Sequence, residues 1–222
     1  MGQVSALLLI LLVAMAALWD RGMWLPGGLL LGLTIIKPQP VAFLVPMLAL
    51  WLLTNLRWRA ILGLVLSLGV TSLGSFLLFP TFVQDWQIVA TAKVGSVIYH
   101  MPTLWGLIAE LVGASTLALE IGIGVTTIVF CAGAFLVTRW GERSALELTG
   151  IILIFSLLVT PYLWDYDQTL LLIPLVIALI RLDQQGVSFK MLALVPLAFD
   201  LLTLLLFSVA TIRLTDIQVR FS

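Results

Sequence analysis

The chain has 222 residues, of which 62% are hydrophobic and only 10% are charged, and its mean hydropathy is +1.19. A soluble domain of this length needs far more charge on its surface, so the composition excludes one. The formal net charge is zero, and we expect no nucleic-acid partner. A single cysteine, Cys131, and a single histidine, His100, exclude a disulfide framework and a histidine-rich metal site.

Apolar runs separated by helix-breaking residues divide the chain into candidate membrane spans, each of which needs about 20 residues or somewhat fewer. Two of the breaks contain proline, KPQP at 37–40 and PYLWDYDQ at 161–168, and each separates two short runs. We predict an all-α polytopic transmembrane helical bundle that forms a single domain over residues 1–222. Its eight expected spans cover residues 3–19, 25–36, 41–54, 60–80, 116–138, 147–160, 169–181 and 191–212.

The basic residues give the orientation of these spans. With Arg57 and Arg59 in the cytoplasm, eight spans place seven basic residues inside and four outside, as the positive-inside rule expects. If one proline break were instead a kink within a single long span, the later spans would invert and this bias would degrade. The eight-span reading puts both proline breaks, both termini and the segment 81–115 on the outer face.

The segment 81–115 is the one long connection, and we expect it to be an extracytoplasmic loop. Its second half, TLWGLIAELVG, is apolar but too short to span, which predicts an interfacial or re-entrant helix. Long loops in compact domains are usually functional. Asp85 is a candidate base here. His100 is a candidate acid–base or phosphate-binding group, and a place in the interfacial aromatic belt is its alternative.

Lys37 follows the apolar run LLLGLTII and directly precedes Pro38-Gln39-Pro40. A lysine at the edge of a span beside a helix break is suited to binding a phosphate as a point charge. The alternative is ordinary snorkelling of the ammonium to the membrane interface. The double-proline break is more than snorkelling requires, and it keeps the phosphate-binding hypothesis open.

Asp165-Tyr166-Asp167 spells D-x-D, a pattern that in many sugar transferases holds a metal and a nucleotide-sugar pyrophosphate. The pattern is short and common by chance. Either carboxylate would also serve as the N-cap of the next helix, where it meets free amides and the positive end of the helix dipole. We favour the cap and leave a dual role open.

The order of these features resembles glycosyltransferase family 87, a mannosyltransferase-like membrane family of the GT-C superfamily. Three stretches carry the likeness and together extend over most of the chain: GGLLLGLTIIKPQP at 27–40, followed by an apolar helix ending in NLRWR at 55–59, HMPTLWGL at 100–107, and TPYLWDYD at 160–167. The resemblance implies a GT-C-like bundle in a bacterial plasma membrane. It also implies transfer of a sugar, mannose or another hexose or pentose, from a polyprenyl phosphate donor to a lipid or glycan acceptor on the outer face.

The resemblance also implies which residues form the site. Family members need an acidic residue in the first outer loop, and Asp20 falls on the cytoplasmic side by the charge distribution. We therefore expect the chain to be the C-terminal part of a larger enzyme, without a bound metal or other cofactor. Candidate catalytic residues are Asp165, Asp167 and Asp85. Candidate donor-phosphate residues are Lys37, Gln39 and His100, and candidate substrate-loop residues are Tyr99, Trp105 and Tyr166.

Two other functions remain as alternatives. Broken helices, Lys37 and the intramembrane carboxylate of Asp200 would suit a secondary transporter or flippase. Transporter sites lie at the bilayer midplane between repeats, however, and this sequence has no internal repeat. The third alternative is a non-catalytic membrane scaffold.

Overall fold

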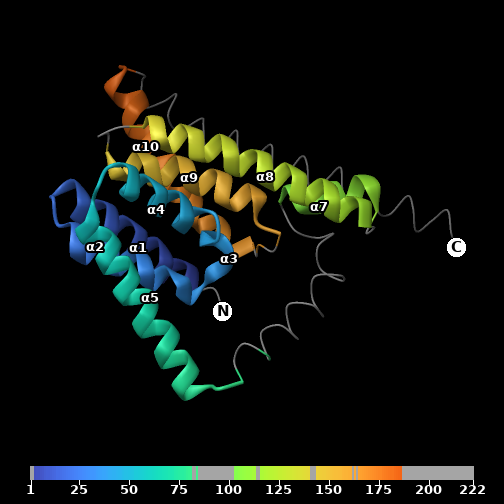
Figure 1. The fold of residues 1–222 in the computed structure, drawn as a ribbon. Coiled ribbons are helices and arrows are strands. Elements are labelled where there is room, and N and C mark those ends of the chain that lie inside the picture. The colour runs from blue at the N-terminus through green and yellow to red at the C-terminus, as the bar shows by residue number, and fades with distance from the viewer. Residues whose placement is uncertain are drawn as a thin grey trace, which may run out of the picture. The chain divides into compact units, whose positions relative to one another are not determined.

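The computed structural model describes residues 3–81, 84, 103–113, 116–140, 144–161, 163 and 165–186. Every element in these residues is helical, which confirms the predicted all-α class. The chain divides after Pro174 into two compact units. In chain order (Figure 1) the elements are α1 (Gln3–Asp20), α2 (Trp24–Leu33), η1 (Thr34–Ile36), α3 (Pro38–Val41), α4 (Leu44–Thr54), α5 (Trp58–Leu78), α7 (Leu104–Val112), α8 (Thr116–Arg139), α9 (Ala145–Val159), η3 (Asp165–Leu171) and α10 (Leu172–Gln184).

Two of the described helices, α5 and α8, are long and apolar enough to cross a membrane. They occupy the segments 60–80 and 116–138 that the sequence predicted as spans. Many of their large hydrophobic side chains are exposed, as expected for helices that face lipid. The other apolar helices are shorter. The arrangement of eight spans therefore stays a prediction, and the expected span 191–212 lies outside the described residues.

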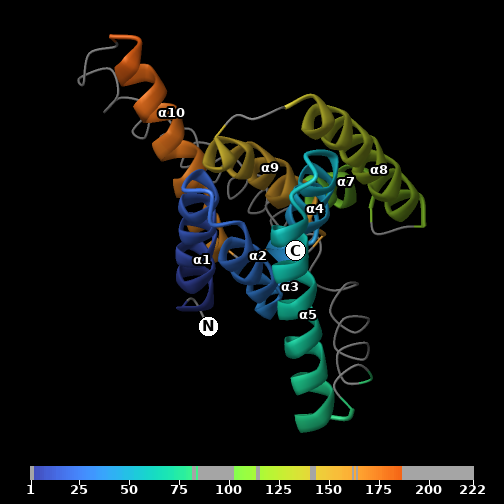
Figure 2. The same cartoon turned by 60° about the vertical axis from the view of Figure 1, so that its left-hand side comes forward.

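Helices α2 and α5 lie side by side in both views, and glycine makes this close contact possible (Figures 1 and 2). A Cβ atom on Gly28 of α2 would lie 2.0 Å from the carbonyl oxygen of Ala60 on α5. A Cβ on Gly63 of α5 would lie 2.3 Å from the carbonyl oxygen of Leu25. Small residues let the backbones of membrane helices approach in this way. The contact fixes α2, which leads to Lys37, against α5, which begins beside Arg57.

The KPQP sequence interrupts what would otherwise be one long helix. Helix α2 tightens into the short 3₁₀ helix η1, and Lys37 leaves the helical region with φ −129° and ψ 87°. Since Pro38 follows, an α-helical backbone is sterically disfavoured at Lys37. A single turn, α3, then begins at Pro38, and α4 continues from Leu44. The break therefore places Lys37 at a bend between helices.

Candidate functional site

The structure brings Lys37 together with one of the D-x-D carboxylates. The Lys37 ammonium forms an ion pair with the Asp167 carboxylate and lies 3.1 Å from the Ser5 hydroxyl. Ser5 donates a hydrogen bond of 2.6 Å to the same carboxylate oxygen of Asp167. The three residues come from α1, the KPQP bend and η3, and up to 162 positions separate them in the chain. We call them the ion-pair cluster.

The ion-pair cluster is almost completely shielded from solvent. Ser5 is fully buried, the Asp167 side chain is 1% exposed and the Lys37 side chain is 13% exposed. A buried charge is costly unless an opposite charge and hydrogen bonds compensate it, and here each charge compensates the other. This arrangement differs from snorkelling, in which the ammonium would be solvated. Of the three side chains in the cluster, that of Lys37 is the most exposed.

Two hydroxyl groups, from Ser156 of α9 and from Thr160 directly after it, hold the bend that carries Lys37. Ser156 donates to the carbonyl oxygen of Pro40 at 2.6 Å, and Thr160 donates to that of Gln39 at 2.9 Å. Proline breaks leave backbone groups without helical partners, and such groups need others at membrane depth. The backbone of Gln39, a candidate donor-phosphate residue, is therefore held by α9. The position of Lys37 depends on α9 as well as on its own helix.

Comparison with known proteins identifies the family. The family model for Glycosyltransferase family 87 matches residues 1–161. This chain belongs to glycosyltransferase family 87. Neither the curated proteins nor the solved structures contain a match. The match confirms the resemblance drawn from the sequence, and it makes this chain a membrane glycosyltransferase by family.

The family 87 match includes part of the ion-pair cluster. Ser5 and Lys37 fall within residues 1–161, as do Ser156 and Thr160, which hold the KPQP bend. Asp167 lies six positions beyond the matched range. The carboxylate that pairs with Lys37 thus comes from the segment after the match, at the second proline break.

Trp105 belongs to the HMPTLWGL stretch of this chain and lies in α7, which packs beside α8. Its indole N–H donates to the Val159 carbonyl at 2.9 Å and to the Thr126 hydroxyl at 3.1 Å. Its ring packs against Gly122, where a Cβ would lie 2.6 Å away. Val159 directly precedes Thr160, the residue that binds the Gln39 carbonyl. Trp105 therefore anchors α7 beside the end of α9 that holds the KPQP bend.

The remaining predicted site residues are described only in part or not at all. Asp165 and Tyr166 lie in η3, and the structure describes their backbone alone. Asp85, Tyr99 and His100 lie outside the described residues. Among the residues that are described, no group of three or more His, Cys, Asp or Glu side chains is placed to hold a metal ion.

Sequence reasoning missed Ser5 and the true environment of Asp167. Ser5 sits among apolar residues of a predicted span, and one serine in a span carries no recognisable pattern. The sequence favours Asp165 or Asp167 as a helix cap, and the side chain of Asp165 lies outside the described part of the chain. Asp167 lies inside η3, and its carboxylate accepts hydrogen bonds from Ser5 and Lys37. Its partners come from distant segments, which local capping rules do not consider.

Asp20 caps a different helix from its own. Its carboxylate accepts from the Ala145 backbone N–H at 3.0 Å and from the Ser144 hydroxyl at 3.3 Å. These groups form the N-terminus of α9, where a carboxylate meets free amides and the positive end of the dipole. Asp20 thus holds the end of α1 against the start of α9.

Proposed function

We propose that this family 87 protein transfers a sugar from a polyprenyl phosphate donor to a lipid or glycan acceptor on the outer face of the bacterial plasma membrane. The sugar is mannose or another hexose or pentose. Family membership supports glycosyl transfer, and the ion-pair cluster supports the nature of the donor. A lysine ammonium at a helix break is suited to a lipid-linked phosphate, because such a donor presents its phosphate at the membrane interface.

Lys37 would act where charge develops during the reaction. The acceptor oxygen forms a bond to the anomeric carbon while the bond from that carbon to the phosphate oxygen breaks. The released polyprenyl phosphate carries more negative charge than the donor did, and a fixed ammonium beside it lowers the barrier. Asp167 and Ser5 would hold the ammonium in place.

The acceptor hydroxyl must also lose its proton, which requires a base. Because Asp167 pairs with Lys37, we assign it to positioning the ammonium. Asp85 and Asp165 then remain as the candidate bases in this chain. The segment 81–115, with Tyr99 and Trp105, would cover the donor sugar together with Tyr166. Gln39 and His100 would join Lys37 at the donor phosphate.

The test is transfer of radiolabelled sugar from a polyprenyl phosphate donor in membranes that contain the wild-type protein or a variant. Lys37→Ala should reduce transfer by about 10²–10³-fold, the usual loss when one group that stabilises a developing anion is removed. Lys37→Arg should retain part of the activity, since it keeps the charge. Arg59→Ala is the matched control, because it removes an exposed cation far along the chain from the KPQP bend.

Three outcomes would contradict the proposal. Unchanged transfer by Lys37→Ala would remove this lysine from the site. Transfer that uses a nucleotide sugar directly, without a polyprenyl intermediate, would overturn the donor. Translocation of a lipid-linked substrate without any transfer would favour the flippase alternative, and the absence of both activities would favour a scaffold.

A further inference from the structure

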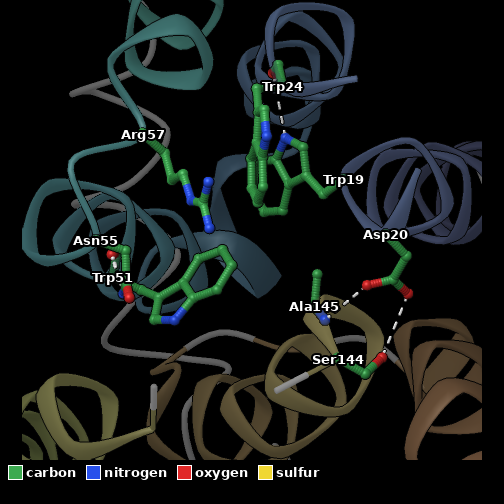
Figure 3. A pocket seen from close by; sticks show the side chains of 8 residues that line it. All are labelled: Trp19, Asp20, Trp24, Trp51, Asn55, Arg57, Ser144 and Ala145. Carbon is green, nitrogen blue, oxygen red and sulfur yellow. Dashed lines mark hydrogen bonds between the residues drawn. The ribbon is translucent and has the colours of Figure 1, made fainter. Parts of the chain in front are cut away.

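A second polar site lies at the other end of α1 from the ion-pair cluster. A pocket of about 210 Å³ is lined by Trp19, Trp24, Trp51, Asn55 and Arg57 (Figure 3). Asp20 at the end of α1, and Ser144 and Ala145 at the start of α9, complete its lining. We call it the tryptophan pocket. At 1.5 Å per residue, the stretch of α1 between Ser5 and Trp19 is about 20 Å long. The tryptophan pocket is therefore distinct from the proposed transfer site.

The three indoles form the wall of the tryptophan pocket by packing on one another. Their ring centroids lie 5.9–6.3 Å apart, and Trp19 and Trp51 are only 2% and 3% exposed. The Arg57 guanidinium covers the Trp24 ring, with its central carbon 4.3 Å from the ring centroid. The aromatic faces are therefore already occupied. A sugar or a quaternary ammonium group, each of which needs an open aromatic face, does not fit this pocket.

Arg57 is placed to recognise an anion. Stacking uses the flat face of a guanidinium, whereas hydrogen bonding uses its edge, so one arginine can do both. In Figure 3 the Arg57 side chain extends between the rings of Trp24 and Trp51, and Asp20 lies on the far side of the pocket. Asn55, whose amide nitrogen donates to the Trp51 carbonyl at 2.8 Å, completes this wall.

The backbone turn that presents Arg57 is unusual. Helix α4 ends in a Schellman motif, in which the Arg57 N–H bonds the Leu52 carbonyl and the Leu56 N–H bonds that of Leu53. Leu56 takes the left-handed position with φ 54°, where glycine is the usual residue. Strained backbone of this kind concentrates at ligand-binding sites. The strain sits directly between Asn55 and Arg57.

The residues that line the tryptophan pocket include one cation, Arg57, and one carboxylate, Asp20. That carboxylate is already engaged by the N-terminus of α9. Basic pockets between membrane helices on the cytoplasmic side bind lipid headgroups, and tryptophan concentrates at the same depth.

The size of the tryptophan pocket also limits its ligand. Pockets that enclose drug-sized molecules measure roughly 300–1,000 Å³, so a pocket of about 210 Å³ suits a smaller group. We propose that the tryptophan pocket binds the headgroup phosphate of an anionic membrane phospholipid, with Arg57 as the phosphate ligand. The acyl chains would extend along the apolar helix surfaces into the bilayer.

Native mass spectrometry of the delipidated, detergent-solubilised protein tests this proposal. Phosphatidylglycerol and phosphatidylcholine of matched chain length are titrated separately onto the wild type, Arg57→Ala and Arg59→Ala. The wild type should bind phosphatidylglycerol more tightly than phosphatidylcholine. Arg57→Ala should weaken phosphatidylglycerol binding by at least about tenfold, the effect of losing one charged hydrogen bond. Arg59→Ala, an equal loss of charge two residues away, should change it less than about threefold.

Several results would overturn the proposal. Equal losses in the two variants would mean a general surface-charge effect, and equal affinity for the two lipids would mean non-specific lipid contact. Competition by inorganic phosphate at the same concentration as the lipid would assign the pocket to a free anion. If Arg57→Ala does not fold, the ratio of phosphatidylglycerol to phosphatidylcholine affinity in the wild type, with and without inorganic phosphate, decides the outcome by itself.

Discussion

The ion-pair cluster and the tryptophan pocket lie at opposite ends of α1 and are built on different physical principles. In the ion-pair cluster, Lys37 and Asp167 neutralise each other in a site where the carboxylate is 1% exposed. In the tryptophan pocket, the Arg57 guanidinium stacks on an indole and stays partly solvated. The first cation depends on a partner 130 positions away. The position of Arg57 depends on the turn at Leu56 and on the ring of Trp24.

This difference sets how each end should respond to substitution. Breaking a buried ion pair leaves one charge without compensation, which typically costs about 3–5 kcal/mol. A cation–π contact at a partly exposed site contributes only about 0.5–1 kcal/mol. The ion-pair cluster should therefore govern the stability of the helices it joins, whereas loss of the Arg57 guanidinium should cost little stability.

Asp167→Ala should have the largest effect on stability. It leaves the Lys37 ammonium in a site where 13% of the side chain is exposed, and we expect a loss of about 3–5 kcal/mol. Thermal unfolding in detergent micelles measures this loss. The double variant Lys37→Met with Asp167→Leu should recover most of it, because no charge is then left buried. If the double variant loses as much stability as Lys37→Met and Asp167→Leu lose separately when added together, the two charges do not compensate each other.

Gly63→Ala should come next and should affect both ends together. Its Cβ would meet backbone atoms of α2 at 2.3 and 2.8 Å, so α2 and α5 must separate, at a cost of about 1–3 kcal/mol. Gly69→Ala on the same helix is the matched control, because no atom lies within 4 Å of its Cβ. Thermal unfolding of Gly63→Ala and Gly69→Ala in detergent micelles measures the difference in their stability. Equal stability of the two variants would mean that close contact between α2 and α5 is not required.

The two Schellman turns near the tryptophan pocket offer a smaller, paired test. Gly22, with φ 75°, closes α1 in the same way that Leu56, with φ 54°, closes α4. Gly22→Ala should cost about 1 kcal/mol, and Leu56→Gly should gain about 0.5–1 kcal/mol, because glycine alone adopts this backbone without strain. Chemical unfolding in mixed micelles measures both changes. A loss of stability in Leu56→Gly would show that the leucine turn is not strained.

Ser156→Ala should have the smallest effect on stability and should act at the ion-pair cluster. Hydrogen bonds between membrane helices average about 0.6 kcal/mol and reach about 1.7 kcal/mol. Losing the bond to the Pro40 carbonyl loosens the bend that carries Lys37, so sugar transfer should fall more than stability does. Thr149→Val is the control on the same helix, since the Thr149 hydroxyl bonds the Ala145 carbonyl within α9. Equal transfer by the two variants would contradict a positioning role for Ser156.

The helices themselves were largely predictable from the sequence. The expected spans 60–80 and 116–138 correspond to α5 and α8, and the prolines of KPQP end one helix and begin another. These are local effects, because an apolar run and a missing N–H act on neighbouring residues. The sequence makes Trp105 a candidate substrate-loop residue, but its role in joining α7 to α8 and α9 depends on residues 21 and 54 positions away.

The sequence by itself determined the helical class, the proline bends, the likeness to family 87 and the choice of Lys37 as the leading cation. Tertiary structure alone decided that Lys37 faces Asp167 and Ser5, that Asp20 caps α9, and that three tryptophans gather around Arg57. The physical reason is the range of the interactions. Helix formation and chain breaks follow from adjacent residues, whereas a charge or an indole acquires its partner only when packing brings distant helices into contact.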